Sequence, residues 1–262
     1  MKAVKHLARA LPFLIAGILP AYAAPAASVK PTVILVHGAF ADSASWNGVV
    51  AKLRSSGYTV IGAANPLRSV KSDAAFLTSI VKSVGGPVVL VGHSYGGAVI
   101  SAAANGQPNV KSLVYVAAFA PEQGETVIGL SGRFPGSTLG GALAKPVALE
   151  GKGKDLYIQQ EKFHQQFAAD LPAAQAQLMA VAQRPVTEAA LNEAAGAPAW
   201  KKLPSYFLYG TSDKNIPPAA LGFMAERAKS RKTVKIDGAS HSVLASHPDA
   251  VAKLIDEAAS AK

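Results

Sequence analysis

The chain has 262 residues, 50% of them hydrophobic, and carries a formal net charge of +10, so it can bury an ample core as one domain with room for an insertion. It has no cysteine, which excludes disulfides, zinc–thiolate sites, thiol catalysis and lipid attachment through an N-terminal cysteine. The positive residues are scattered in pairs without interleaved aromatic residues, which indicates solvated surface, mildly attractive to anions, and argues against a nucleic-acid partner.

The first residues follow the order of a secretory signal peptide: positive charges, an apolar run, and small residues around a cleavage point. These parts are, in chain order, Lys2, Lys5 and Arg9, then LPFLIAGIL, then Ala21-Tyr22-Ala23. We expect cleavage after Ala23, with Ala26 as the alternative, so that residues 1–23 are the signal peptide and 24–262 the exported domain. The apolar run is interrupted by Pro20 and is too short for a bilayer of about 30 Å. The sequence therefore predicts a periplasmic or secreted protein without a stable membrane anchor.

The next part of the chain alternates between apolar runs and segments of helical periodicity. Short continuous apolar runs predict buried parallel strands, and apolar residues at helical spacing predict amphipathic helices. In order, these are a strand over 33–36, a helix over 43–56, a strand over 58–63, a helix over 69–84, a strand over 88–91 and a further helix. This order requires a parallel sheet with helices on both of its faces.

The segment from Val88 to Gly97, VVLVGHSYGG, is the one around which the chain is organised. A strand, a sharp turn that carries one serine, and a helix form a nucleophile elbow. Gly92 and Gly96 flank Ser94 because the turn is too tight for side chains there. The helix behind Ser94 aims its N-terminal amides at an oxyanion on a bound acyl group. A glycine-flanked serine alone is weak evidence for a catalytic nucleophile, so the interpretation depends on the rest of the chain.

The second half of the chain interrupts the alternation and then resumes it. After a strand over 113–119, residues 122–200 are rich in Gly, Ala and Gln, with helices expected over 161–170 and after Pro172. We interpret 122–200 as a cap inserted above the sheet. The alternation resumes with strands over 205–209 and 233–236 and helices over 219–229 and 248–259. The predicted fold class is α/β: a mostly parallel sheet of about six strands, helices on both faces and an inserted helical cap.

Three residues that suit nucleophilic catalysis each follow a predicted strand. Ser94, Asp213 and His241 occur in the order nucleophile, acid, base, and open parallel sheets bind ligands at the carboxyl ends of their strands. A serine hydroxyl needs a base to take its proton and a carboxylate to fix the tautomer of that base. We therefore predict that Ser94 attacks an acyl carbon, His241 moves the proton and Asp213 holds the Nδ1 hydrogen of His241.

Backbone amides beside these residues are candidates for an oxyanion hole. One is the amide of Tyr95, the residue after the nucleophile, and the other is that of Ala39 or Phe40, in the loop after the first strand. The side chains of Phe40 and Tyr95 are fixed beside the chemistry, so we expect them to line the substrate site. Other aromatic residues that could line a pocket beneath the cap are Phe119, Phe134, Tyr157, Phe163 and Phe167.

Other titratable residues have simpler roles. Glu122 is a rival to Asp213 as the acid, because it also follows a strand, but it suits a surface position equally well. The remaining candidates are expected to bond locally, to pack, to cap a helix or to lie at the surface: His37, His93, His164, His247, Asp237 and Asp249. Asp213 and His241 therefore remain the preferred acid and base.

Four segments carry a resemblance to a known family: VILVHGAFADSASW, VLVGHSYGGAVI, YGTSDKNIPP and GASHSVLASHPDAV. With them the chain resembles the α/β-hydrolase superfamily, and within it a bacterial serine esterase branch similar to plant methyl esterases and hydroxynitrile lyases. The resemblance covers nearly all of residues 24–262 and implies the α/β-hydrolase fold. The lyases of that branch have a lysine directly after the catalytic histidine. Here Ser242 stands there, which favours hydrolysis over cyanohydrin cleavage.

These observations together predict an exported serine hydrolase, with no cofactor and no metal, that cleaves small to medium carboxylic esters through an acyl-enzyme on Ser94. Its partners are then small-molecule esters. Three alternatives stay open. The same triad serves hydrolysis of lactones or amides, or peracid formation; the chain could be a hydroxynitrile-lyase-like enzyme; or it could be a non-catalytic receptor that kept the pocket. The number of subunits carries no signal in the sequence.

Overall fold

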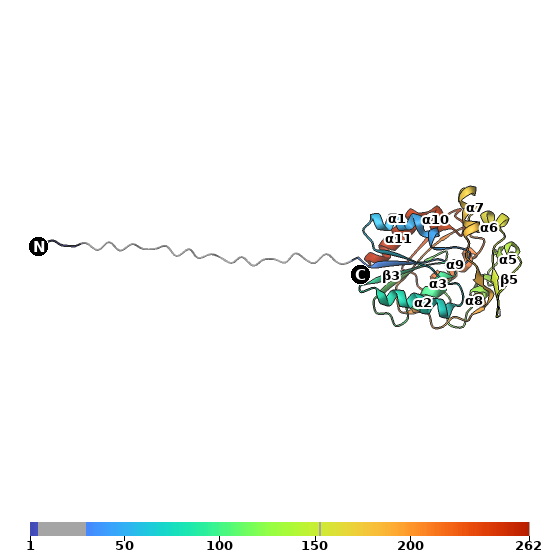
Figure 1. Cartoon of the computed structure of the whole chain (residues 1–262), viewed down its shortest axis with the longest axis horizontal. Helices are drawn as coiled ribbons and strands as arrows, with labels where there is room; N and C mark the ends of the chain where they lie inside the picture. Colours follow the sequence, from blue (N-terminus) through green and yellow to red (C-terminus); the bar gives the residue numbers. More distant parts are fainter. Residues whose placement is uncertain (5–29, 152, 262) are drawn as a thin grey trace.

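The structure is a computed structural model, and it describes residues 1–4, 30–151 and 153–261. The expected signal peptide, residues 1–23, lies outside the described residues apart from its first four positions. The folded part begins just before the first strand of a central sheet (Figure 1).

Six parallel strands form the central sheet, as the alternation of apolar runs predicts. Their order across the sheet is β2-β1-β3-β4-β8-β9, and each adjacent pair runs parallel. The strands are β1 (Thr32–Val36), β2 (Val60–Ala63), β3 (Val88–His93), β4 (Val110–Val116), β8 (Ser205–Gly210) and β9 (Lys232–Ile236). β3 is buried along its whole length because it lies inside the sheet with helices over both faces.

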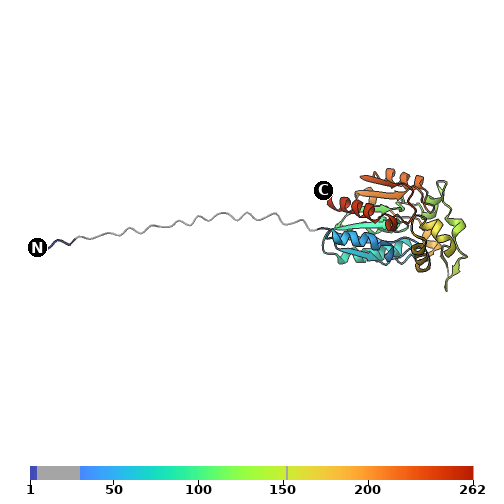
Figure 2. The ribbon, with the colours of Figure 1, turned by 90° about the horizontal axis from the view of Figure 1, so that it is seen from above.

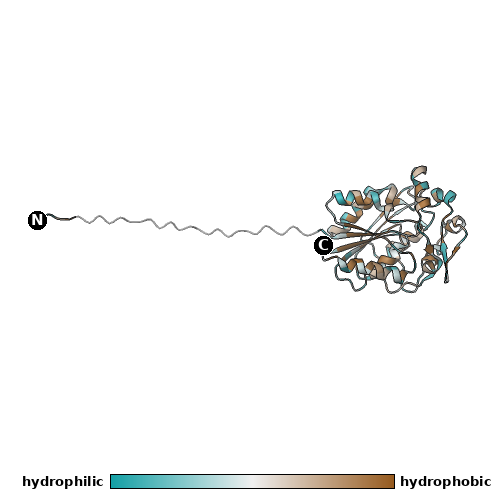
Figure 3. Ribbon diagram, in the orientation of Figure 1, coloured by the Kyte–Doolittle hydropathy of each residue, from teal (hydrophilic) through white to brown (hydrophobic). Residues whose placement is uncertain are grey.

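Helices cover both faces of this sheet (Figure 1). α1, α10 and α11 lie on one face, and α2 and α3 lie on the other. The helices that flank the sheet are α1 (Asn47–Ser55), α2 (Val70–Ser83), α3 (Gly96–Ala103), α9 (Pro218–Arg227), α10 (Val243–Ser246) and α11 (Pro248–Ser260). A 3-10 turn, η1 (Ser43–Trp46), directly precedes α1. Each long helix turns an apolar stripe to the strands, so the hydrophobic colour concentrates between the layers in Figure 3. Within the described ranges, no helix has the length and hydropathy needed to cross a bilayer.

The segment between β4 and β8 lies beyond one end of the sheet in both views (Figures 1 and 2). We call residues 122–200 the inserted segment. Its elements are α4 (Val127–Gly132), α5 (Leu139–Ala142), β5 (Val147–Ala148), β6 (Lys154–Leu156), α6 (Gln160–Phe167), α7 (Ala173–Ala182), β7 (Val186–Thr187), α8 (Glu188–Asn192) and the 3-10 turn η2 (Ala199–Lys201). α6 and α7 match the two expected helices. The small antiparallel sheet β5-β6-β7 was not predicted, because strands this short leave no alternation pattern in the sequence.

Arg68, in the loop after β2, forms hydrogen bonds and an ion pair that join the inserted segment to the sheet domain. Its Nη1 lies 2.7 Å from Asp155 Oδ1 on β6, and its Nη2 donates to the carbonyl oxygen of Pro185 at 2.8 Å. The carbonyl oxygen of Arg68 accepts from Thr187 Oγ1 on β7 at 2.7 Å. The edge of the small sheet is therefore held against the loop that follows β2.

Candidate active site

Ser94 lies in the turn between β3 and α3 with a left-handed backbone, at φ 54°. Few residues other than glycine adopt this conformation, and it lifts the serine side chain away from the end of the strand. Two glycines make room for the turn. A Cβ at Gly92 would lie 2.6 Å from the carbonyl oxygen of Gly96, and one at Gly38 would lie 2.5 Å from Ser94 Cβ. The glycines near Ser94 are thus explained by close approach.

Asp213 and His241 form a buried pair beyond the ends of β8 and β9. Asp213 Oδ2 lies 2.7 Å from His241 Nδ1, and the two residues are only 3% and 1% exposed. The other oxygen, Oδ1, accepts from the backbone N–H groups of Asn215 at 2.8 Å and Ile216 at 2.9 Å. The carboxylate is therefore fixed on both sides, and it accepts the Nδ1 hydrogen of the imidazole, which leaves Nε2 as the nitrogen that can act as a base.

His93, the residue before Ser94, holds the backbone of His241. Its Nε2 donates to the carbonyl oxygen of His241 at 3.0 Å, and the two rings are 4.7 Å apart between centroids. Burial, together with the nearby His241, keeps the pKa of His93 well below its ordinary value, so the ring is neutral at neutral pH. The His93 ring packs against Trp46 and Phe167, and its hydrogen-bond partner lies 148 positions away in the chain. Phe167 of α6 packs edge-on against His241 from the inserted segment.

The backbone amides considered for an oxyanion hole differ in their contacts. Phe40 N–H donates to the carbonyl oxygen of Arg184 at 3.0 Å, so it is already engaged. Among the described residues, no backbone carbonyl accepts from the N–H of Ala39 or of Tyr95. Of the two alternatives in the loop after β1, the geometry therefore leaves the amide of Ala39 for a ligand.

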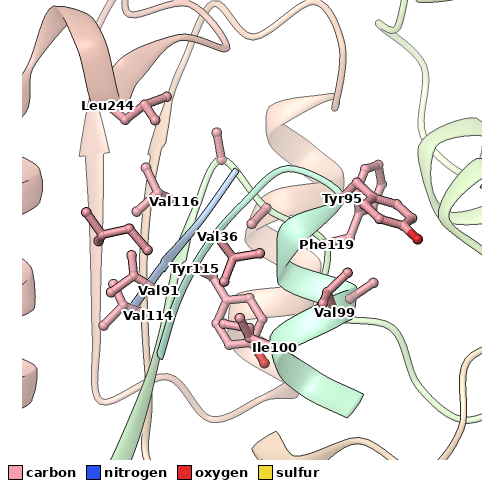
Figure 4. Packing of buried hydrophobic residues seen from close by; sticks show 14 of the residues in the cluster. Val36, Val91, Tyr95, Val99, Ile100, Val114, Tyr115, Val116, Phe119 and Leu244 are labelled. Carbon is pink, nitrogen blue, oxygen red and sulfur yellow. The ribbon is translucent and has the colours of Figure 1, made fainter. Parts of the chain in front are cut away.

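Ser94 and His241 line one cavity of about 260 Å³ between the sheet and the inserted segment. Phe40, Tyr95 and Phe119 also line it, and Figure 4 shows Tyr95 and Phe119 side by side near the start of α3. The inserted segment contributes mostly apolar and small residues: Val127, Ile128, Ser131, Gly132, Ser137, Leu139, Gly140, Leu143, Leu156 and Leu191. Four aromatic residues named as candidates do not line it: Phe134, Tyr157, Phe163 and Phe167. No hydrogen bond between Ser94 Oγ and His241 is present among the described residues.

The hydroxyl of Tyr95 is bound by a buried carboxylate, a contact that no sequence pattern predicts. This hydroxyl donates to Asp73 Oδ2 at 2.9 Å, and Asp73, in the first turn of α2, is fully buried. Both oxygens of Asp73 also lie 3.2 Å from the backbone N–H of Arg68. Burial and the Asp73 carboxylate raise the pKa of Tyr95, so its hydroxyl stays protonated as a donor. An acidic residue in a first helical turn is too common to single out from sequence.

The alternative acidic residues have other partners. Glu122 lies 2.7 Å from Lys201 Nζ, and this contact lowers the pKa of its carboxyl group. Asp237 accepts from Thr211 Oγ1 in a turn, and Asp249 pairs with Lys52 at the start of α11. These contacts agree with the surface and turn roles, but Asp249 is not the cap: the N-cap of α11 is His247, and Asp249 lies in the first turn of the helix.

The other histidines bond within their own surroundings. Burial lowers the pKa of His37 to about 4, and its Nδ1 donates to the carbonyl oxygen of Gly38 at 2.9 Å. His164 Nε2 contacts the carbonyl oxygen of Leu171 within the inserted segment, and His247 lies 2.9 Å from Ser246 Oγ. In the described ranges no group of three or more His, Asp or Glu side chains is arranged to hold a metal ion.

A family profile and several known proteins match this chain. The profile described as "Alpha/beta hydrolase family" matches residues 33–254. The chain is 26% identical over 253 residues to the alpha/beta hydrolase nvfD of Aspergillus novofumigatus (strain IBT 16806), which covers 88% of this chain and 97% of that protein. It is 33% identical over 110 residues to the carbendazim hydrolyzing esterase of Nocardioides sp. (strain SG-4G), covering 37% of this chain and 46% of that one.

Among solved structures, polyneuridine aldehyde esterase superposes with a TM-score of 0.75 at 18% identity, covering 87% of this chain and 99% of that chain. At this level of identity the likeness concerns the fold.

Proposed function

Since the chain belongs to the alpha/beta hydrolase family, we propose that it is an exported serine hydrolase that cleaves small to medium carboxylic esters through an acyl-enzyme on Ser94. The observation that carries the proposal is the buried His241–Asp213 contact of 2.7 Å, in a cavity whose wall also contains Ser94. The names of two similar proteins, a carbendazim hydrolyzing esterase and polyneuridine aldehyde esterase, support an ester as the substrate.

In the first half of the reaction, Ser94 Oγ forms a bond to the acyl carbon while His241 Nε2 takes the hydroxyl proton. This step requires Oγ and Nε2 to come within hydrogen-bond reach when the substrate binds. The negative charge that develops on the acyl oxygen is stabilised by the amides of Tyr95 and Ala39. As the bond to the alcohol breaks, His241 returns its proton to the leaving oxygen. The products of this half are the free alcohol and acyl-Ser94.

In the second half, water replaces the alcohol. His241 Nε2 takes a proton from the water as its oxygen attacks the acyl carbon, and gives that proton to Ser94 Oγ as the acyl group leaves as the acid. Asp213 stabilises the imidazolium in both halves through its contact with Nδ1. The residue after His241 is Ser242, a neutral side chain, and its N–H donates to the carbonyl oxygen of Phe167. A neutral residue there favours hydrolysis over release of cyanide.

The proposal is tested by replacing Ser94 with Ala and measuring turnover of p-nitrophenyl acetate. We expect the variant to lose turnover and labelling by a fluorophosphonate probe, while its circular dichroism matches the wild type. Ser131→Ala is the matched control, since Ser131 lines the same cavity and its hydroxyl donates only to the carbonyl oxygen of Asn215. Retained turnover in the Ser94 variant would refute the mechanism, and a wild type that is not labelled would point to a receptor.

Export is the second part of the proposal, and it is supported by the charged, apolar and small-residue order of residues 1–23. Expression of the full chain in a bacterial host, followed by mass measurement of the periplasmic fraction, tests it. We expect a protein that begins at Ala24. An uncleaved chain that stays in the cytoplasm would contradict export and leave the hydrolase proposal unaffected.

A further inference from the structure

A second cavity lies beside the catalytic cavity, and one residue borders both. We call it the outer groove; its volume is about 320 Å³, and it lies between α7 of the inserted segment and the η1–α1 region. Its apolar wall includes Leu178, Met179 and Ala182 of α7, and Leu178 is 74% exposed. Phe40 lines the outer groove and also lines the cavity that contains Ser94. The two spaces therefore meet at Phe40.

Phe40 is held at this boundary by its backbone. It has a left-handed conformation with φ 60°, and its N–H donates to the carbonyl oxygen of Arg184 at 3.0 Å. The next residue, Pro185, is bound in turn by Arg68 Nη2 at 2.8 Å. The inserted segment and the sheet domain thus fix the Phe40 backbone from both sides. Phe40 is 3% exposed and contributes to the walls of both cavities.

We propose that the side chain of Phe40 is the partition that closes the catalytic cavity toward the outer groove and so limits the size of the ester that acylates Ser94. This inference rests on the proposed function, because it concerns the substrate of the same site. A cavity of about 150 Å³ holds one benzene ring, so the catalytic cavity of about 260 Å³ holds roughly ten non-hydrogen atoms. The substrates are then compact esters, and long acyl chains are excluded.

Truncation of the ring tests the partition. Phe40→Ala joins the catalytic cavity to a groove larger than itself, and Phe40→Leu removes less of the wall. The first series consists of p-nitrophenyl esters from acetate to dodecanoate, and the second of acetates of increasingly long alcohols. The readout is the ratio of kcat/KM for long and short members, which is insensitive to a uniform loss of activity. We expect the ratio in one series to rise about fourfold for each methylene that enters the groove. The total rise should be larger in the Phe40→Ala variant than in the Phe40→Leu variant.

Two further variants locate the effect. Val181→Ala changes an exposed residue of α7 that lines neither cavity, so we expect the long-to-short ratio to stay near the wild-type value. Met179→Trp, added to Phe40→Ala, fills the outer groove from α7 and is expected to return the ratio toward the wild-type value. The series that responds identifies whether the acyl or the alcohol part faces Phe40.

The possible results separate this inference from the proposed function. A wild type that turns over short esters through Ser94, with unchanged ratios in both series for Phe40→Ala, overturns the partition and leaves the hydrolase standing. A rise in the ratio that Met179→Trp does not reverse also overturns it, because the extra chain would then lie elsewhere. Absence of any turnover dependent on Ser94 overturns the proposed function and this inference with it.

Discussion

Ser94 occupies a backbone conformation that costs stability. A serine at φ 54° is strained by the order of 1 kcal/mol. The chain tolerates the strain because glycines at 38 and 92 let the surrounding backbone close around the turn. Ser94 lines the cavity between the sheet and the inserted segment, so the proposed nucleophile lies where a substrate would bind.

Replacement of Asp213 by Asn is a sharp test at the same scale. The amide keeps the shape of the carboxylate and its acceptor oxygen toward the N–H groups of Asn215 and Ile216, but it presents N–H to His241 Nδ1 and favours the wrong tautomer. We expect kcat for a short-chain ester to fall by about 10³- to 10⁴-fold with the fold intact.

Glu122→Gln is the matched control for Asp213→Asn, because Glu122 was the rival acid and pairs with Lys201. It is expected to keep kcat within about twofold of the wild type, since an exposed ion pair contributes little. If the Gln variant lost more activity than the Asn variant, Asp213 would not be the acid. Steady-state kinetics on both purified variants, with far-UV circular dichroism as a check on folding, decides between these outcomes.

At the scale of elements, the inserted segment depends on a few long-range contacts with the sheet domain. The guanidinium of Arg68 donates to the carbonyl oxygens of Pro66 and Pro185 and to the carboxylate of Asp155, whose side chain is 10% exposed. Removing the guanidinium leaves a nearly buried carboxylate without its cation, which is more costly than losing an exposed pair. The loop after β2 and the small sheet β5-β6-β7 are therefore coupled.

We expect Arg68→Ala to lower the free energy of unfolding by about 2 kcal/mol, a figure that is discounted because the Arg68 side chain is 39% exposed. Urea denaturation followed by fluorescence measures it. Lys52→Ala is the control, because Lys52 and Asp249 form a pair with side chains 50% and 76% exposed, and we expect a change within about 0.5 kcal/mol. Equal changes in the two variants would show that Arg68 is only a surface residue.

The elements that the sequence predicts well are those with a long pattern. β1, α2, β3 and α11 lie within a few residues of their predicted ranges, because burial of one helical stripe or of a whole strand leaves a periodic signal. The strands β5, β6 and β7 contain two or three residues each, and their pairing is decided by tertiary contacts. Ser94, Asp213 and His241 are predicted because each follows a predicted strand, and the structure brings Asp213 and His241 into contact.

The contacts around those three residues could not be named in advance. The Tyr95–Asp73, His93–His241 and Phe40–Arg184 hydrogen bonds join positions far apart in the chain, through side chains or backbone groups that have many other partners available. No spacing rule relates such positions. A sequence pattern therefore identifies reacting groups more readily than the groups that hold them in place.

At the scale of the whole molecule, two buried neutral histidines make stability depend on pH. Burial is the main reason why the pKa of His37 falls from its ordinary value of 6.5 to about 4; the nearby Arg184 also lowers this pKa, and Asp42 raises it. Burial also lowers the pKa of His93. The unfolded chain takes up these protons below about pH 6.5, whereas the folded protein resists them. Stability is thus fully present above that pH and is lost as the pH falls through the window toward 4.

The prediction is that the free energy of unfolding decreases from neutral pH to about pH 5, with each such histidine contributing up to about 1.4 kcal/mol per pH unit. Urea titrations at several pH values give the slope. His37→Asn removes one of the two protons, so the slope is expected to become shallower. A slope that His37→Asn does not alter would contradict the assignment.

The hydrogen bond from His93 to the carbonyl oxygen of His241 has a consequence for heat inactivation. Because His93 and Ser94 are adjacent in the chain, thermal motion of β3 displaces Ser94 and His241 in the same direction, and we expect their separation to change little. We therefore expect Ser94 and His241 to stay aligned on warming until the sheet itself unfolds. The curve of activity against temperature would then follow the Arrhenius rise up to the melting transition and collapse with it, instead of declining beforehand.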